Sequence, residues 1–175
     1  EYEGGMLAPF IVSWGKPDDS NLWQKKLPVK RGAIQEQLAT VMDIYPTVLA
    51  LTGVKNPSDH ILDGFDLKKQ LRGETDKKRP DRFLMHFPHA HRGNYFTSFR
   101  DGDWKLIYWY NPETPDQPSY ELYNLLSDPF EMKDLAGERK DILKSMIGKM
   151  ADGLVREGAL YPEDKDGNSI KPVIP

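Results

Sequence analysis

The chain has 175 residues, of which 38 % are hydrophobic and 29 % are charged, and its formal net charge is −3 at pH 7. That apolar content is enough for a folded core and excludes disorder as the overall class, while the slightly acidic balance argues against nucleic acid as a partner. The chain contains no cysteine, which excludes disulfides, zinc–thiolate sites and cysteine nucleophiles from this stretch. No apolar run approaches the ~18 residues that a membrane span needs.

The first predicted element is a strand over residues 8–14, where the nearly continuous apolar run APFIVSW lies between Gly5 and Gly15. Such a run is typical of a strand buried on both faces, as in a parallel sheet. A strand of that kind needs a neighbour on each side, and this chain offers few candidates for the same sheet. The run therefore suggests that partner strands are missing.

A short helix of about ten residues is predicted between Asp43 and Gly53. Asp43 fits an N-cap whose side chain accepts a hydrogen bond from a free backbone N–H, and Gly53 stands where a helix would end. The stretch from Asp63 to Arg82 is rich in turns and charges. We interpret it as a solvated linker; a functional basic patch is the alternative, although acidic residues are interleaved with the basic ones.

The next part of the sequence predicts four short strands, whose spacing favours a four-stranded antiparallel sheet. They lie at residues 82–87, 95–99, 104–110 and 120–125. Asp101-Gly102, between the second and third strands, is a typical hairpin-turn signal.

A helix is predicted over residues 138–157, with an apolar stripe that would pack on the sheet. The stripe consists of Ile142, Met146, Met150 and Leu154, with Leu143 and Ile147 beside them. Residues 161–175 are expected to be irregular. Within them, residues 164–168 (DKDGN) are interpreted as a surface turn rather than a calcium loop, because the glycine is misplaced and no late glutamate follows.

Three segments in the first half of the chain resemble motifs of one enzyme family, the sulfatases. Residues 3–11 (EGGMLAPFI) resemble the pattern E-G-G-x-R-x-P-hydrophobic, with Leu7 in place of the arginine. Residues 43–49 (DIYPTVL) resemble the helix motif D-x-x-P-T-x-L, and residues 62–67 (LDGFDL) resemble the turn that follows it.

The second half carries further matches in the family's order. Residues 100–107 (RDGDWKLI) resemble the R-x-G-x-W/Y-K-L hairpin. Residues 121–131 (ELYNLLSDPFE) resemble E-L-Y-D/N-L-x-x-D-P-x-E, and residues 134–136 (DLA) resemble the N/D-L-A ending. Each match alone is weak, but all of them in this order are specific, so the chain resembles the C-terminal portion of a type I, formylglycine-dependent sulfatase or arylsulfatase.

The resemblance implies an α/β architecture, the alkaline-phosphatase-like sulfatase fold. Residues 1–75 would be the incomplete C-terminal end of its large α/β domain. Residues 76–160 would form a C-terminal subdomain of a four-stranded antiparallel sheet and a packed helix, and residues 161–175 an irregular tail. The first partner implied is therefore the remaining N-terminal part of the same sulfatase.

The resemblance also implies the chemistry of sulfate ester hydrolysis. Family members use a formylglycine, made from Cys or Ser in a C/S-x-P-x-R motif, with a divalent cation, usually calcium, that stabilises charged oxygens. The nearest match here, SDPFE at residues 127–131, has Glu131 in place of the arginine. No residue of this chain is therefore assigned as a nucleophile or metal ligand. Calcium is expected only in the intact enzyme, and the fragment alone is expected to be inactive.

Three of the four histidines gather in one segment, HFPHAHRGN at residues 86–94. In the family a similar stretch faces the active-site cleft, where imidazoles and an arginine would hydrogen-bond sugar hydroxyls or a second anionic group. The candidate substrate-binding residues are His86, His89, His91, Arg92 and Asn94. The alternatives are structural histidines in a turn, and a metal site at His89 and His91, which no nearby carboxylate or cysteine completes.

The sequence thus predicts part of a sulfuric ester hydrolase that acts on a sulfated carbohydrate or another sulfated small molecule. One alternative is a phosphoester or phosphonate hydrolase of the same fold. The other is a non-catalytic carbohydrate-binding module, against which the buried strand at residues 8–14 argues. By analogy with the family, a periplasmic or secreted location is expected.

Overall fold

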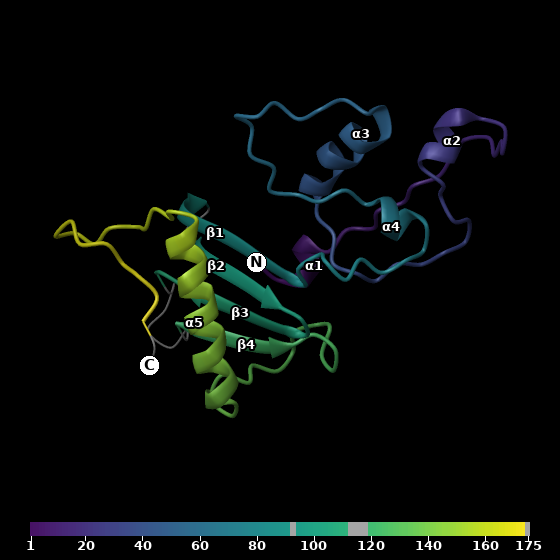
Figure 1. Ribbon diagram of the computed structural model, residues 1–175. Coiled ribbons are helices and arrows are strands. Elements are labelled where there is room, and N and C mark those ends of the chain that lie inside the picture. Colours follow the sequence, from purple (N-terminus) through teal and green to yellow (C-terminus); the bar gives the residue numbers. More distant parts are fainter. Residues whose placement is uncertain (92–93, 112–118, 174–175) are drawn as a thin grey trace. The chain divides into compact units, whose positions relative to one another are not determined.

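The computed structural model describes residues 1–91, 94–111 and 119–173, and it divides into two compact units (Figure 1). The sheet unit comprises Glu1–Ala8 and Arg82–Pro175, and the loop unit comprises Pro9–Asp81. The first eight residues thus belong with a sheet that begins at Arg82. Within the described residues, no helix is long and apolar enough to span a membrane.

The sheet unit is built on a four-stranded antiparallel sheet in the order β1-β2-β3-β4, which confirms the prediction. Its strands are β1 (Arg82–His91), β2 (Asn94–Asp101), β3 (Trp104–Trp109) and β4 (Tyr120–Asn124). The predicted hairpin between β2 and β3 turns at Gly102, whose φ of +61° suits glycine. β1 continues to His91 instead of ending at Phe87, with a break in register between these two residues.

One face of the sheet is covered by the helix α5 (Lys140–Arg156), as the amphipathic stripe predicted (Figure 1). Ile147, Met150 and Leu154 of the helix are fully buried against Leu106 and Leu122 of the sheet. Gly153 allows the close approach, because a Cβ there would lie 3.1 Å from Leu84 Cδ2. This is the main hydrophobic core of the unit.

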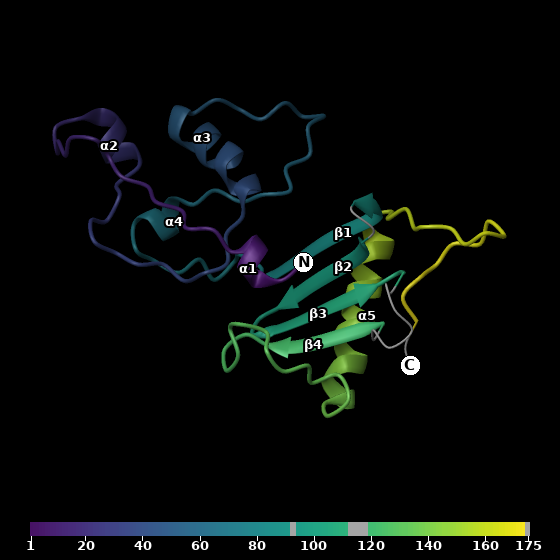
Figure 2. The ribbon, with the colours of Figure 1, turned by 180° about the vertical axis from the view of Figure 1, so that it is seen from behind.

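The second face of the sheet, turned away from α5, carries a smaller apolar cluster together with buried polar side chains (Figure 2). The apolar members are Phe96, Ile107, Trp109 and Tyr123. Lys105 and Glu121 lie on the same face, because they are the cross-strand partners of Tyr123 and Ile107. Glu3, the first residue of the short helix α1 (Glu3–Met6), pairs with Lys105, and Tyr2, just before the helix, donates to Glu121.

The loop unit contains short helices and no strand, and all of its residues are described. The helices are α2 (Leu22–Lys26), the 3₁₀ turn η1 (Val41–Asp43), α3 (Ile44–Thr52) and α4 (Lys68–Leu71). α3 confirms the predicted helix, and Gly53 ends it at φ +75°.

The predicted strand at residues 8–14 is wrong for this structure. These residues have no strand conformation, and Phe10 and Ile11 are 57 % and 88 % exposed. A strand exists only through hydrogen bonds to a neighbouring strand, and the loop unit provides none. That partner strands bury this apolar run stays a prediction, because pattern alone cannot supply the pairing.

The stretch from Asp63 to Arg82 is more than the solvated linker that the sequence predicted. α4 lies within it, and Leu67, Gln70 and Arg79 are buried. Turn-rich composition indicates only the local conformation, whereas these residues make hydrogen bonds to residues twenty or more positions upstream.

The part of the tail that the structure describes, up to Val173, is irregular, as expected, with one isolated bridge between Glu163 and Ser169. The turn at residues 164–168 is confirmed: Asp164 Oδ1 accepts the backbone N–H groups of Asp166 and Asn168, both at 2.9 Å. These hydrogen bonds, with that of Asn168 first, hold the pKa of Asp164 below its usual value.

Candidate functional site

A buried ion cluster joins three segments of the sheet unit on its second face. Lys105 Nζ lies 2.9 Å from Glu3 Oε1 and 2.9 Å from Glu131 Oε1, and the lysine side chain is only 1 % exposed. Glu131 Oε2 also accepts the backbone N–H of Glu3 at 2.6 Å. Arg100 adds a more distant positive charge, 4.0 Å from Glu3 Oε2. One buried cation is thus shared by two carboxylates.

A third carboxylate on this face, that of Glu121, is held by neutral donors. Glu121 accepts hydrogen bonds from Tyr2 Oη (2.8 Å), Tyr123 Oη (3.0 Å) and Trp109 Nε1 (3.0 Å). Burial, followed by the hydrogen bond to Glu121, raises the pKa of Tyr2; burial, followed by the charge of Glu121, raises that of Tyr123. The two clusters together fasten residues 2 and 3 to β3 and β4.

A third polar clamp lies within the loop unit and centres on Asp43. Asp43 Oδ1 accepts the N–H of Phe65 at 2.8 Å, and Oδ2 accepts the N–H of Thr40 at 2.6 Å. Arg79 completes the clamp with a buried ion pair to Asp43 Oδ2. The expectation that the Asp43 side chain caps the helix is therefore wrong, because turn and arginine donors occupy both carboxylate oxygens.

The neighbouring Thr47 and Gly64 extend this clamp. Thr47 Oγ1 donates to the carbonyl of Asp43 at 2.6 Å and accepts the N–H of Leu67 at 2.9 Å. A Cβ on Gly64 would lie 2.2 Å from the carbonyl oxygen of Met42, so only glycine fits. The conspicuous sequence motifs thus act as structural clamps, in which side chains from distant segments hold one another.

The histidine segment, the only candidate site that the sequence singled out, is divided between the two faces of the sheet. His86 points to the side of α5: Nε2 lies 2.6 Å from the carbonyl oxygen of Leu160, and Nδ1 lies 2.8 Å from Thr97 Oγ1. Its ring also packs edge-on against Tyr110 and Tyr161. Since a carbonyl only accepts, Nε2 carries the proton, and both ring nitrogens are engaged within the chain.

His89 lies in a different environment, exposed and against an aromatic row. Its ring centroid is 4.6 Å from that of Phe87, which stacks on Phe96 at 5.7 Å, and Phe96 contacts Trp109 at 5.9 Å. The structure therefore does not bring His86 and His89 together. The backbones of His91 and Asn94 face each other where β1 meets β2, and Arg92 lies outside the described residues.

Metal binding is not supported by the described residues. Among them, no group of three or more His, Asp or Glu side chains is arranged so that it could hold a metal ion. The fourth histidine, His60, is exposed, and its ring lies edge-on to that of Tyr45, with the ring centroids 5.7 Å apart.

A groove in the loop unit is a candidate site that the sequence analysis did not identify. Its volume is about 600 Å³, and it is lined by residues 11–14 and 28–33 together with Pro17, Asp19, Gln24 and Lys25. The signal that could have revealed it is the run KKLPVKR at residues 25–31, which contains four basic residues and no acidic one.

Comparison with known proteins identifies the family of this chain, which the geometry alone does not. The family model described as N-sulphoglucosamine sulphohydrolase, C-terminal, matches residues 2–158. N-acetylglucosamine-6-O-sulfatase of Bacteroides thetaiotaomicron is 30 % identical over 142 residues, which cover 78 % of this chain and 22 % of that protein. N-acetylgalactosamine-6-sulfatase of Canis lupus familiaris is 31 % identical over 108 residues, covering 62 % of this chain and 17 % of that protein.

Solved structures of known proteins also resemble this chain. A protein solved in complex with its substrate D-glucosamine-2-N,6-O-disulfate superposes with a TM-score of 0.58 at 26 % identity, covering 74 % of this chain and 26 % of that one. A 2-O GAG sulfatase shares the fold, with a TM-score of 0.52 at 24 % identity over 66 % of this chain and 24 % of that one. This chain thus spans about a quarter or less of the proteins that it resembles.

Proposed function

Because the chain belongs to the sulfatase family, as a C-terminal portion matched over residues 2–158, we propose that it is part of a longer enzyme that hydrolyses sulfate esters. The single observation that carries this proposal is the family match, which extends over both units. The loop unit would be the end of the large α/β domain of the alkaline-phosphatase-like fold, and the sheet unit its C-terminal subdomain.

The proposed substrate is a sulfated carbohydrate. Support comes from relatives named as N-acetylglucosamine-6-O- and N-acetylgalactosamine-6-sulfatases, and from a structural neighbour solved with a disulfated glucosamine. The test is to express the whole protein and to measure release of inorganic sulfate from 6-O-sulfated amino sugars. Release of sulfate supports the proposal, whereas release of phosphate from phosphoesters without any sulfate release contradicts it.

The catalytic groups are proposed to lie outside this chain. Sulfatases as a family are metal-dependent, and calcium is the proposed ion here. The described residues do not fit such an ion, because they contain no cluster of three suitable ligands. The isolated chain is therefore proposed to be inactive, and the formylglycine and calcium ligands would come from the N-terminal remainder. Export to the periplasm or the exterior is also proposed, by family analogy.

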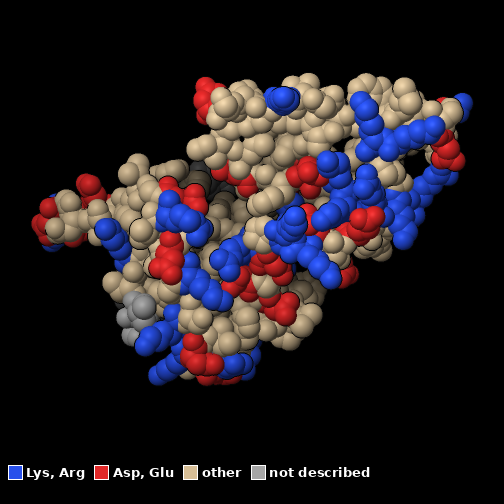
Figure 3. Space-filling view, in the orientation of Figure 1, with Lys and Arg blue, Asp and Glu red and all other residues tan. Residues whose placement is uncertain are grey.

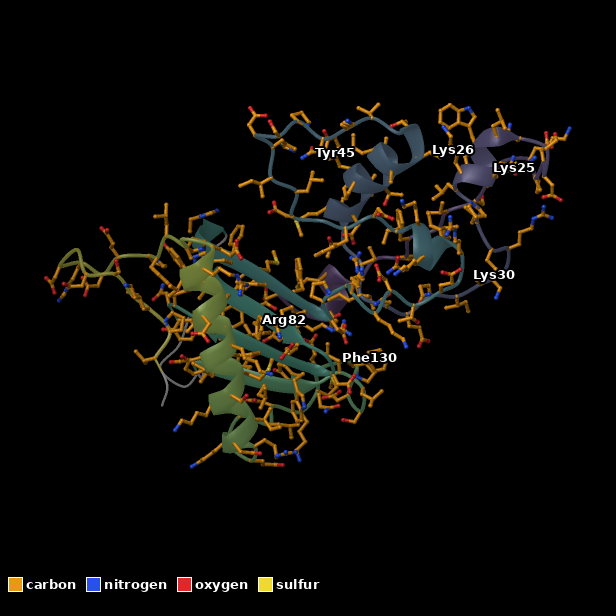
Figure 4. The ribbon with its side chains drawn as sticks, viewed as in Figure 1. Lys25, Lys26, Lys30, Tyr45, Arg82 and Phe130 are labelled. Carbon is orange, nitrogen blue, oxygen red and sulfur yellow. The ribbon has the colours of Figure 1, made fainter. Side chains whose placement is uncertain are left out.

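An unburied apolar surface of the loop unit supports the existence of that remainder. α3 is apolar around most of its circumference, and Ile44, Tyr45 and Val48 are exposed (Figure 4). The space-filling view shows hardly any charge over this helix (Figure 3). A helix that is apolar all round is typical of a protein interior, so we propose that the remainder of the enzyme covers α3.

Within this enzyme, the histidine segment is proposed to form part of the substrate-binding wall, with His89 as the residue that contacts the sugar. Its ring is exposed and is supported by Phe87. His86, whose nitrogens are both engaged, would instead fix β1 to the segment at Leu160. His91, Arg92 and Asn94 remain proposed members of the same wall.

A further inference from the structure

The loop between β4 and α5 presents three large apolar side chains at the surface of the sheet unit. Leu126, Phe130 and Met132 are 77 %, 82 % and 83 % exposed. Figure 4 shows Phe130 on this loop, beyond the end of the sheet. Single apolar residues are common on protein surfaces, but three on one short loop, with an aromatic ring and a methionine among them, are typical of a contact surface.

The loop is held in one conformation by its own polar groups. Asn124 Oδ1 accepts the backbone N–H of Ser127 at 3.1 Å, and Asp128 Oδ2 accepts that of Lys133 at 2.9 Å. The backbone N–H of Asp128 donates to the carbonyl of Asn124 at 2.8 Å, which closes the turn. A surface that is already fixed loses little conformational freedom when a partner covers it.

Glu131 stands between the two most exposed side chains, and it is turned inward. Its φ of +53° is uncommon for a residue other than glycine, and its side chain is only 2 % exposed. Lys105 Nζ, at 2.9 Å, and the backbone N–H of Glu3, at 2.6 Å, hold its carboxylate. The buried ion cluster therefore fixes the segment that carries Phe130 and Met132 while leaving both of them at the surface.

We propose that Leu126, Phe130 and Met132 form a docking surface for the N-terminal remainder of the same enzyme, and that the buried ion cluster holds this surface in place. The inference rests on the proposed function, in which the chain is the C-terminal portion of a longer protein. Such a remainder would be large, because this chain covers only 22 % of the Bacteroides thetaiotaomicron relative.

The contact between Glu131 and Glu3 is the reason to choose this partner over others. In the whole enzyme, the residue before Glu1 is three positions from Glu3, and three extended residues span at most about 11 Å. The remainder is therefore tethered next to the loop, which gives it an effective concentration on the order of millimolar. A second copy of the protein or an unrelated protein has no such tether.

The test places a photo-crosslinking residue on the loop of the whole enzyme, as Phe130→p-benzoylphenylalanine. The matched control is Val155→p-benzoylphenylalanine, since Val155 is 76 % exposed on α5. Cross-linked peptides are identified by mass spectrometry in a mixture of isotope-labelled and unlabelled protein, which separates links within one molecule from links between two.

Position 130 is expected to cross-link within one molecule to a peptide that precedes Glu1, and position 155 is not. Links between two copies overturn the proposal, as do links only to residues 1–175, or equal cross-linking from both positions. In a second measurement, Phe130→Ser with Met132→Ser should lower the Tm of the whole enzyme on the order of 5 °C, whereas Val155→Ser should change it little. An unchanged Tm in the double variant would mean that the loop stays exposed to water, which also overturns the proposal.

These measurements do not depend on catalysis. A whole enzyme that shows the expected cross-link but releases no sulfate would contradict the proposed function and support the docking surface. Sulfate release without the cross-link would support the proposed function and overturn the docking surface.

Discussion

Glu3 and Lys105 are separated by 102 positions in the sequence, yet their charged groups lie 2.9 Å apart in the buried centre of the sheet unit. Glu3 belongs to the first motif of the chain and Lys105 to the hairpin motif. Glu131, from the motif after β4, completes the cluster. Three motifs that are distant in the sequence therefore meet at a single lysine.

Replacement of Lys105 by Met should lower the free energy of unfolding by about 3–5 kcal/mol, because it leaves the buried carboxylate of Glu131 without its cation and Glu3 with only the more distant Arg100. Chemical denaturation of the purified chain measures the loss. Lys144→Met, at an exposed position of α5, is the control and should change stability little. A loss below 1 kcal/mol for Lys105→Met would show that the ion cluster does not stabilise the unit.

Replacement of Gly64 by Ala should destabilise the loop unit by about 1–3 kcal/mol or more, because the new Cβ would overlap the carbonyl of Met42. Gly137→Ala is the matched control, since nothing lies within 4 Å of a Cβ at that position. Hydrogen exchange of the α3 amides, compared between the two variants, reports the effect locally. Equal protection in both would contradict the close approach at Gly64.

Replacement of Ile147 by Ala should cost about 2–5 kcal/mol, because this fully buried side chain fills the space between α5 and the sheet. Val155→Ala, at a site of α5 that is 76 % exposed, should have a much smaller effect. Thermal unfolding followed by circular dichroism compares the two. Similar shifts in Tm would mean that α5 does not pack on the sheet through this stripe.

Alkaline pH should unfold the sheet unit. Burial is the largest cause that raises the pKa of Tyr2, Tyr110, Tyr120 and Tyr123. Below about pH 10 both states hold these protons, so their contribution to stability is constant. Above it the unfolded chain releases protons that the folded chain retains, so stability falls as pH rises. Tyrosinate absorbance should therefore appear together with the loss of circular dichroism; tyrosinate formation in a fully folded chain would contradict this linkage.

Replacement of His89 by Ala in the whole enzyme should lower kcat/KM on a sulfated sugar by about tenfold, the cost of one hydrogen bond of roughly 1.4 kcal/mol to the substrate. His60→Ala is the control, because His60 is also exposed and also contacts an aromatic ring. Unchanged kinetics in His89→Ala, or equal losses in both variants, would remove His89 from the substrate-binding wall.

The strands and α5 could be predicted from the sequence because their signals are local. The β-forming run at residues 104–110, the turn at Gly102 and the stripe through Met146 and Met150 each need only a few neighbouring residues to be recognised. The antiparallel order of the strands followed from their short connections.

The polar clamps could not be predicted, because they depend on pairings across long stretches of chain. Nothing near Asp43 in the sequence indicates that Arg79, 36 positions later, takes its carboxylate. The candidate site was equally hard to resolve. The proximity of His86 and His89 in the sequence suggested one cluster, but alternation along β1 and the break after Phe87 direct their rings to different neighbours.

The return of residues 1–8 to the sheet unit makes that unit discontinuous, with the loop unit inserted into it between Ala8 and Arg82. A protein engineer who cuts the chain at Arg82 to obtain the sheet alone would discard Tyr2 and Glu3. Glu121 would lose one of its three hydrogen-bond donors, and Lys105 would lose one of its two counter-ions. An autonomous version of the sheet therefore has to carry the N-terminal octapeptide with it, joined by a new connection or supplied as a separate peptide. The affinity of that peptide for the sheet would measure how much the contacts of Tyr2 and Glu3 stabilise the unit.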